Sequence, residues 1–282
     1  MHVRIATLPG RADRPNEDHA AACGGTAVVV DGVTARTETH CVHGVAWFAE
    51  HLARGVLDAR HRAPRDALRA AIVATAARHA ATCDLAAPAT PCAAVGIVQV
   101  GDGRLRYLVL GDVTVVLGGK SGERVVCDGR VEDTARAQRD AAARLPLGSP
   151  ARDAALREMK LVEIAARNRA GGYWIAGADP AAADEALVGE VALPDVTRVA
   201  LLSDGAARAV DPFGLTDWRG VLHLLAHDGP RELLDRVRAA ERADPDATRR
   251  PRTKVSDDAT AVFWDDLAGA GDDLRERECA SR

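Results

Sequence analysis

The feature that most constrains the fold of this chain is a set of short acidic motifs spread over nearly its whole length. The motifs are Arg14-Pro15-Asn16-Glu17-Asp18, Asp31-Gly32, Ser203-Asp204-Gly205 and Asp257-Asp258-Ala259-Thr260. Three of them adjoin apolar runs that are typical of β-strands, at residues 28–30, 199–202 and 261–264. Carboxylates at strand ends that lie so far apart in sequence make sense if folding brings them to one point.

Such a cluster of carboxylates would repel itself unless a cation lay between its members. Mg²⁺ and Mn²⁺ are the natural occupants, because these hard divalent ions take oxygen ligands and keep several waters. The pattern therefore predicts a divalent metal centre built from residues of distant segments.

The order of these motifs resembles that of the type 2C family of metal-dependent serine/threonine protein phosphatases, and the resemblance runs from residue 1 to about 266. One Asp-Gly pair would indicate little, since Asp and Gly are common in turns. Four elements in the family's order, each beside the expected strand, are much more specific.

Composition limits the class of protein. The chain has 282 residues, of which 47% are hydrophobic and 28% charged, so it can bury a sizeable core. Its net charge of −4 gives no reason to expect a nucleic-acid partner. The sequence lacks the layout of a signal peptide and any apolar run long enough to span a membrane, so we expect a cytoplasmic protein without a membrane partner.

Hydrophobic periodicity predicts the secondary structure. Strands are expected over 2–8, 26–30, 93–100, 105–110, 113–117, 187–193 and 197–202, and helices over 43–59, 64–83, 216–226 and 230–242. The strands between 93 and 117 follow one another with short turns at Asp102-Gly103 and Gly111-Asp112, which predicts an antiparallel meander.

Taken alone, this pattern indicates an α+β fold with mostly antiparallel strands. The family resemblance implies more: a four-layer α-β-β-α sandwich of two antiparallel sheets flanked by helices. We expect one phosphatase-like domain over 1–266, with an insert or flap at about 131–180, and a polar, disordered tail over 267–282.

The resemblance also implies the roles of the acidic residues. Asp31 would bridge two Mn²⁺ or Mg²⁺ ions, and the carbonyl of Gly32 would bind one of them. Asp204 and Asp257 would hold the first ion, and Glu17 the second. A water that bridges the ions would attack phosphorus, since two cations activate water and neutralise phosphoryl charge.

Departures from the family's pattern concern the phosphate anchor and a third ion. Arg14 is the expected anchor, because a guanidinium pairs with two phosphate oxygens, but it lies one residue closer to Asn16 than usual, and Arg11 is the alternative. Asp112 matches a ligand of a third ion. Arg208 occupies the place of another ligand, which argues against that ion.

Three functions stay open. The first is a phosphatase that hydrolyses phosphoserine or phosphothreonine in a protein partner, such as the target of a serine/threonine kinase. The second is a catalytically weak or inactive relative that binds a phosphoprotein, a hypothesis suggested by the position of Arg14 and by Arg208. The third is a phosphatase for a small metabolite.

Two other motifs favour plainer interpretations. His40-Cys41-x-His43 suggests zinc, but it lacks a second pair of ligands at suitable spacing, so core and helix-capping roles are favoured. The basic stretch 249–254 could attract a phosphorylated partner, but a solvated loop is the favoured interpretation. Asp102-Gly103 is interpreted as an ordinary turn.

Overall fold

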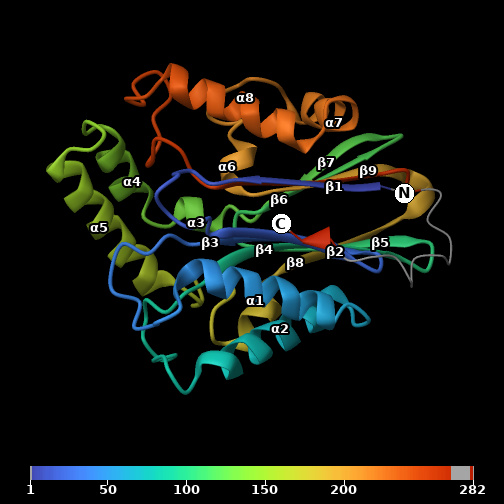
Figure 1. The fold of residues 1–282 in the computed structure, drawn as a ribbon, viewed down its shortest axis with the longest axis horizontal. Helices are drawn as coiled ribbons and strands as arrows, with labels where there is room; N and C mark the ends of the chain where they lie inside the picture. The colour runs from blue at the N-terminus through green and yellow to red at the C-terminus, as the bar shows by residue number, and fades with distance from the viewer. Residues whose placement is uncertain (1, 268–279, 282) are drawn as a thin grey trace.

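Two antiparallel β-sheets pack face to face, and a pair of helices covers the outer face of each (Figure 1). The computed structural model describes residues 2–267 and 280–281. This arrangement is the predicted α-β-β-α sandwich, so the predicted fold class is confirmed.

The first sheet has the strand order β1-β10-β9-β6-β7 within the described chain. Its strands are β1 (His2–Leu8), β10 (Ala259–Asp265), β9 (Val196–Leu202), β6 (Thr114–Gly119) and β7 (Gly122–Val126). Helices α7 (Trp218–His227) and α8 (Pro230–Ala243) cover its outer face.

The second sheet has the order β11-β2-β3-β4-β5-β8. Its strands are β11 (Ala280–Ser281), β2 (Asp18–Cys23), β3 (Thr26–Gly32), β4 (Ala93–Gly101), β5 (Arg104–Leu110) and β8 (Leu187–Ala192). Helices α1 (Gly44–Asp58) and α2 (Pro64–His79) cover its outer face (Figure 1).

The described chain has four further helices, α3 (Arg130–Asp133), α4 (Arg136–Ala143), α5 (Pro150–Ala166) and α6 (Asp204–Ala207). There are also 3₁₀ turns at Pro180–Glu185 and Leu193–Asp195. The first three of these helices fall within the predicted insert at 131–180. Figure 1 shows α4 and α5 projecting beyond the strand ends.

The helices form where the sequence gives them an apolar stripe. In α1 the residues Val45, Phe48, Leu52 and Val56 recur at helical spacing, and all four are buried against the second sheet. Burying each large side chain contributes about 1.5–3 kcal/mol. Other apolar residues fill the space between the sheets, and Trp264 is the largest fully buried one.

The predicted meander over 93–117 is wrong in its last step. Strands β4 and β5 pair with each other, but β6 pairs with β7 and β9 in the other sheet. The chain changes sheets at Gly111-Asp112, where Gly111 has φ +79° and a Cβ would lie 2.7 Å from the Cβ of Ala94. Local periodicity marks strands, but it carries no information on which sheet each strand joins.

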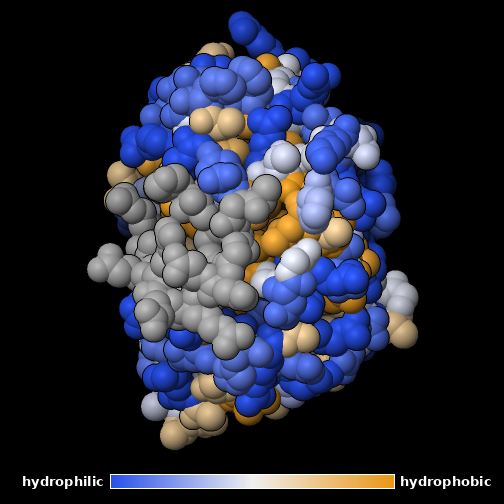
Figure 2. All heavy atoms as spheres, turned by 90° about the vertical axis from the view of Figure 1, so that its right-hand side faces the viewer, coloured by the Kyte–Doolittle hydropathy of each residue, from blue (hydrophilic) through white to orange (hydrophobic). Residues whose placement is uncertain are grey.

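The remaining surface gives two observations. No helix of the described chain is long and apolar enough to cross a membrane. On the face at the end away from α4 and α5, apolar side chains show in the middle of a mostly polar surface (Figure 2). The predicted tail over 267–282 lies outside the described residues, except for Leu267 and the two residues of β11.

Candidate metal centre

Five of the predicted site residues, Gly32 and four aspartates, line one cavity of about 650 Å³. Asp31 lies near the end of β3, Asp112 lies between β5 and β6, Asp204 begins α6 after β9, and Asp257 precedes β10. Residues of the predicted insert also border this cavity, from α3, α4 and α5. The fold therefore gathers carboxylates from across the sequence, as the motifs predicted.

Two glycines allow the acidic segments to approach each other. A Cβ on Gly32 would lie 2.4 Å from the carbonyl oxygen of Glu17, and the Gly32 N–H donates to that oxygen at 3.2 Å. A Cβ on Gly205 would lie 1.9 Å from the carbonyl oxygen of Asp258. Only residues without a side chain fit at these two contacts.

Asp258 fixes the first acidic segment in place. Its carboxylate accepts hydrogen bonds from the backbone N–H of Gly10 at 2.7 Å and of Glu17 at 2.6 Å. The loop that carries Glu17 is therefore anchored to the residue that follows Asp257.

Asp18 is buried directly opposite Asp31 on the neighbouring strand. Its Oδ2 has no hydrogen-bond partner among the described residues. Burial is the main cause that raises the pKa of Asp18 to about 8, with repulsion from Asp204 adding to it. Asp18 therefore belongs to the acidic cluster, although it does not line the cavity.

Asp31, Asp112 and Asp204 repel one another. Loss of hydration raises the pKa of Asp31 well above its ordinary value, and the charges of Asp18, Asp204 and Asp112 raise it further. Loss of hydration and the charge of Asp204 raise the pKa of Asp112 to about 7. Loss of hydration and the charge of Asp257 raise the pKa of Asp204, although the nearby charges of Arg208 and Lys254 oppose this. None of the three forms an ion pair with Lys, Arg or His in the described part of the chain. The backbone N–H of Asp204 does donate to Asp31 Oδ2 at 3.1 Å.

Asp257 differs, because both of its carboxylate oxygens already contact cations. Lys254 Nζ lies 2.6 Å from Oδ1, and Arg208 Nη2 lies 3.1 Å from Oδ2. Burial alone would raise the pKa of Asp257, but the charges of Lys254 and Arg208 lower it.

The basic stretch 249–254 is a solvated loop only in part: residues 249–251 are exposed, as expected, but the favoured interpretation is wrong for Arg252 and Lys254. Arg252 is buried and pairs with Asp244 at 2.9 Å, while Lys254 reaches into the cavity. This ion pair could have been suspected from the sequence, because Lys254 lies only three residues before Asp257 in the same loop.

Arg208 belongs to a buried network of charges. It pairs with Glu241 at 2.9 Å, and Glu241 also pairs with Arg238 at 2.7 Å. Arg238 in turn donates to the backbone carbonyls of Leu8 and Asp257. Arg208 thus connects α8 to the segment that carries Asp257. The sequence showed only that Arg208 stands where a metal ligand was expected, and it did not predict this connection.

Glu17 lies at the end of a hydrogen-bond chain. Lys254 Nζ donates to Thr34 Oγ1 at 2.9 Å, and Thr34 Oγ1 donates to Glu17 Oε2 at 2.6 Å. Burial raises the pKa of Glu17. Glu17 itself is not among the residues that line the cavity, whereas Thr34 is.

Arg14 is exposed on the loop between β1 and β2 and does not line the cavity. Arg11, the alternative anchor, pairs with Asp13 at 2.6 Å on the same loop. The arginines that do line the cavity, besides Arg208 and Arg252, are Arg36, Arg136 and Arg139. Sequence reasoning did not single out these three, because they lie outside the acidic motifs.

The donor set fits divalent cations at Asp31, Asp112 and Asp204. These are hard oxygen ligands that face one cavity without a paired side-chain cation. Asp257 fits less directly, since an ion that bound it would have to compete with Lys254 and Arg208 for the same carboxylate. Within the described chain, the centre therefore has three carboxylates without an ion pair, and a fourth that is already paired with two cations.

Comparison with solved structures identifies the fold. PstP/Ppp of Mycobacterium tuberculosis matches at 16% identity and a TM-score of 0.54, over 94% of this chain and 97% of that one. MsPP of Mycobacterium smegmatis, a PPM Ser-Thr phosphatase, matches at 16% identity and a TM-score of 0.52, over 94% of this chain and 98% of that one. PppA of Pseudomonas aeruginosa matches at 15% identity and a TM-score of 0.54, over 93% of this chain and 96% of that one.

No protein-family model matches the sequence, and no curated protein sequence matches it either. At identities of 16% and below, the likeness to solved structures concerns the fold. The predicted resemblance is confirmed at that level: this chain has the fold of the PPM-type serine/threonine phosphatases.

Proposed function

We propose that this protein is a Mn²⁺- or Mg²⁺-dependent phosphatase that hydrolyses phosphoserine or phosphothreonine in a protein partner. One observation carries the proposal: Asp31, Asp112 and Asp204 converge on one cavity, their pKa values are raised by burial and by neighbouring carboxylates, and none of them has an ion-paired cation in the described chain. A structure of the PstP catalytic domain with two manganese ions supports the choice of metal.

In this proposal Asp31 would hold both ions and the Gly32 carbonyl one of them, while Asp204 and Asp257 would hold the first ion and Glu17 the second. Bound ions would activate a water and neutralise charge on the phosphoryl group. Asp112 is available to a third ion, but the guanidinium of Arg208 beside Asp257 opposes the binding of more cations there.

The chain's own residues would position the substrate. Arg36 brings positive charge to the cavity, and a guanidinium can pair with two phosphate oxygens. Arg136 and Arg139 also line the cavity, but they already pair with Asp133 and Glu163. Helices α3–α5 border the cavity and would act as the flap that contacts the segment around the phosphorylated residue. Arg14 stays a candidate anchor from the sequence, and its exposed position would suit contact with a protein substrate.

A second candidate is a weakly catalytic protein that binds a phosphoprotein. The pairing of both Asp257 oxygens with Lys254 and Arg208 favours it, because these cations replace part of the charge that metal ions would supply. In that case the cavity would still attract phosphate through its arginines.

Hydrolysis of an aryl phosphate by chelator-treated protein, with and without Mn²⁺, tests the proposal. Asp31→Asn should lower kcat by roughly 10²–10³-fold, the loss typical of removing one strong electrostatic contact to the reacting group. Asp102→Asn is the matched control, because Asp102 precedes a glycine in an exposed hairpin turn between β4 and β5.

Metal-dependent turnover that survives in Asp102→Asn and is lost in Asp31→Asn supports the phosphatase. A folded wild type without turnover, which nevertheless binds a phosphopeptide more tightly than its unphosphorylated form, supports the second candidate. Comparing phosphopeptides with small phosphoesters then separates a protein phosphatase from a metabolite phosphatase.

A further inference from the structure

Two cysteines and a histidine meet at a second place, on the outer side of the second sheet. Cys41 lies in the loop that follows β3, His79 is the last residue of α2, and Cys83 follows that helix. Cys41 Sγ is 3.2 Å from Cys83 Sγ and 3.6 Å from His79 Nδ1. All three ligand atoms lie within 4.8 Å of one another.

These distances are close to those around a tetrahedral zinc ion. With bonds of about 2.3 Å to sulfur and 2.0 Å to nitrogen, two ligands lie about 3.5 Å apart for a sulfur and a nitrogen, and about 3.8 Å for two sulfurs. The Cys41–His79 separation already matches, and the two sulfurs would need to move apart by about half an ångström.

The backbone holds these side chains together. The N–H of Asp84 donates to the carbonyl of His40 at 3.1 Å, which ties the Cys41 loop to the Cys83 segment. The N–H of Cys83 donates to the carbonyl of His79 at 3.0 Å, so the last turn of α2 fixes the spacing of the other two ligands. The three residues are therefore preorganised by contacts that involve no metal.

The imidazole of His79 is oriented toward the thiols. His79 is 1% exposed, and its ring packs among the rings of Trp47 and Phe48. Its Nδ1 contacts Cys41, while Nε2 has no hydrogen-bond partner among the described residues. The thiol is thus the one polar contact recorded for this buried ring in the described chain.

The fourth side of the cluster is open. Cys41 and Cys83 are both partly exposed, and His43 is exposed beside them, with its ring centroid 6.2 Å from that of His79. His43 Nε2 contacts Thr82 Oγ1 at 3.2 Å, on the turn that leads to Cys83. A water or the imidazole of His43 can therefore complete a four-coordinate site.

We propose that Cys41, His79 and Cys83 form a zinc site separate from the acidic cavity. Thiolate and imidazole are the ligands that zinc prefers, whereas Mn²⁺ and Mg²⁺ prefer the oxygens of the acidic cavity. Within the described residues this is the one group of three such ligand atoms gathered so closely. The motif His40-Cys41-x-His43 lacked a second ligand pair in sequence, and the end of α2 supplies it in space.

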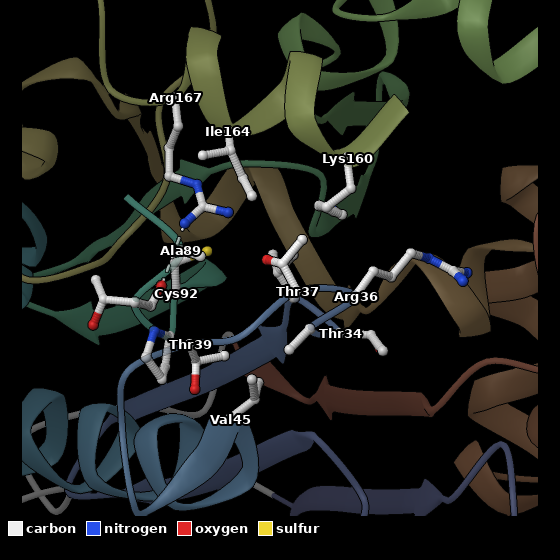
Figure 3. A pocket seen from close by; sticks show the side chains of 14 residues that line it. Thr34, Arg36, Thr37, Thr39, Val45, Ala89, Cys92, Lys160, Ile164 and Arg167 are labelled. Carbon is white, nitrogen blue, oxygen red and sulfur yellow. Dashed lines mark hydrogen bonds between the residues drawn. The ribbon is translucent and has the colours of Figure 1, made fainter. Parts of the chain in front are cut away.

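The site would anchor the loop that leaves the candidate metal centre. That loop carries Thr34, which contacts Lys254, and it lines a small pocket against α5 and the segment 89–92 (Figure 3). Figure 3 shows Arg167 pointing from the end of α5 toward that segment, where it donates to the carbonyl of Thr90 at 3.3 Å. Zinc at Cys41 would thus hold one wall of this pocket.

Titration of the reduced, chelator-treated full-length protein with Co²⁺ tests the proposal, because cobalt–thiolate bonds give charge-transfer absorption that carboxylates do not. One equivalent of Co²⁺ should produce this absorption band, and added Zn²⁺ should displace Co²⁺ and abolish the band. Cys41→Ser and Cys83→Ser should each weaken Zn²⁺ binding by roughly 10–100-fold or more, since even indirect partners of a metal cost that much.

Cys127→Ser is the matched control, because Cys127 is a free, exposed cysteine that lines the acidic cavity instead. The band should persist in Cys127→Ser and in Asp31→Asn, and it should vanish in the double variant Cys41→Ser/Cys83→Ser with unchanged circular dichroism. Absence of the band in reduced wild type, or its loss in Cys127→Ser alone, would overturn the proposal. The proposal would also be overturned if Cys41 and Cys83 formed a disulfide and the protein did not bind Zn²⁺ after this disulfide was reduced.

Discussion

The ammonium of Lys254 lies 2.6 Å from Asp257 Oδ1, within the cavity where the sequence predicts that Asp257 binds a divalent ion. Burial alone would lower the pKa of Lys254, but the charges of Asp257 and Asp204 raise it, so the side chain is a cation across the physiological range. The chain thus carries its own positive charge into the acidic cluster, and a metal ion must compete with it for Asp257.

Replacing Lys254 with methionine should therefore tighten metal binding. Without the ammonium, Asp257 is freer to bind Mn²⁺, and we expect the Mn²⁺ concentration for half-maximal binding to fall roughly tenfold, which corresponds to about 1.4 kcal/mol. Calorimetric titration measures this directly. The metal-free variant should also melt at a lower temperature than wild type, because the carboxylates lose a counter-ion, and Mn²⁺ should restore its stability.

Lys160→Met is the control for this experiment. Lys160 also lines the cavity, but it pairs with Glu163 on α5 at 2.6 Å and forms no ion pair with Asp257, and its charge acts on Asp112 only from a distance. Equal changes in Mn²⁺ affinity for both variants would mean that Lys254 acts through the general field of the cavity and does not compete for Asp257.

Replacing Arg208 with methionine should destabilise the protein by about 3–5 kcal/mol, the cost of breaking a buried ion pair by removing one partner. Arg208 is 8% exposed, and its loss leaves Glu241 with Arg238 alone and Asp257 with Lys254 alone. Urea denaturation gives the free energy of unfolding. Arg231→Met, which removes an exposed i,i+4 pair with Asp235, should cost below about 1 kcal/mol.

The stability of the metal-free protein should depend on pH through Asp112. Its pKa is raised to about 7 in the folded protein, mainly by lost hydration, from about 3.9 in an unfolded chain. A carboxyl with a raised folded pKa favours folding most below the unfolded value and loses that contribution as pH rises toward 7. Asn is neutral throughout, so Asp112→Asn should gain stability over wild type as pH rises from about 5 to 7.

Thermal melting of both proteins at several pH values measures this difference and cancels the titration of other groups. Saturating Mn²⁺ should reduce the difference, since a bound cation stabilises the ionised carboxylate. An advantage of Asp112→Asn that is constant from pH 5 to 7 would contradict the raised pKa.

Most of the elements, and the meeting of the four acidic segments, were predictable from the sequence. Periodicity located β1 and α1 within a residue or two, because each element buries one regular set of apolar side chains. The assignment of β6 to its sheet was not predictable in this way. A strand that is buried on both faces has the same apolar pattern whichever sheet it joins, and the turn at Gly111-Asp112 has a sequence typical of a hairpin.

The site was predictable only as far as its motifs reached. Asp31, Asp112, Asp204 and Asp257 do line one cavity, but the pairing of Lys254 with Asp257 depends on how the 243–256 loop folds. The cluster at Cys41 is a further case, because Cys41 and Cys83 are 42 positions apart in the chain. Ligands brought together by a helix end leave no short motif for sequence reasoning to find.

Replacing Gly205 with alanine should disrupt the acidic centre more than its small size suggests. A Cβ there would lie 1.9 Å from the carbonyl oxygen of Asp258, so the two backbones must move apart. Overpacking of this kind typically costs about 1–3 kcal/mol, and here it also separates Asp204 from Asp257. We expect weaker Mn²⁺ binding together with lower stability. Gly129→Ala is the control, because no atom lies within 4 Å of the added Cβ, and it should change neither Mn²⁺ binding nor stability. Calorimetry and urea denaturation measure the two quantities. Equal behaviour of the two variants would show that the close backbone contact at Gly205 does not set the geometry of the site.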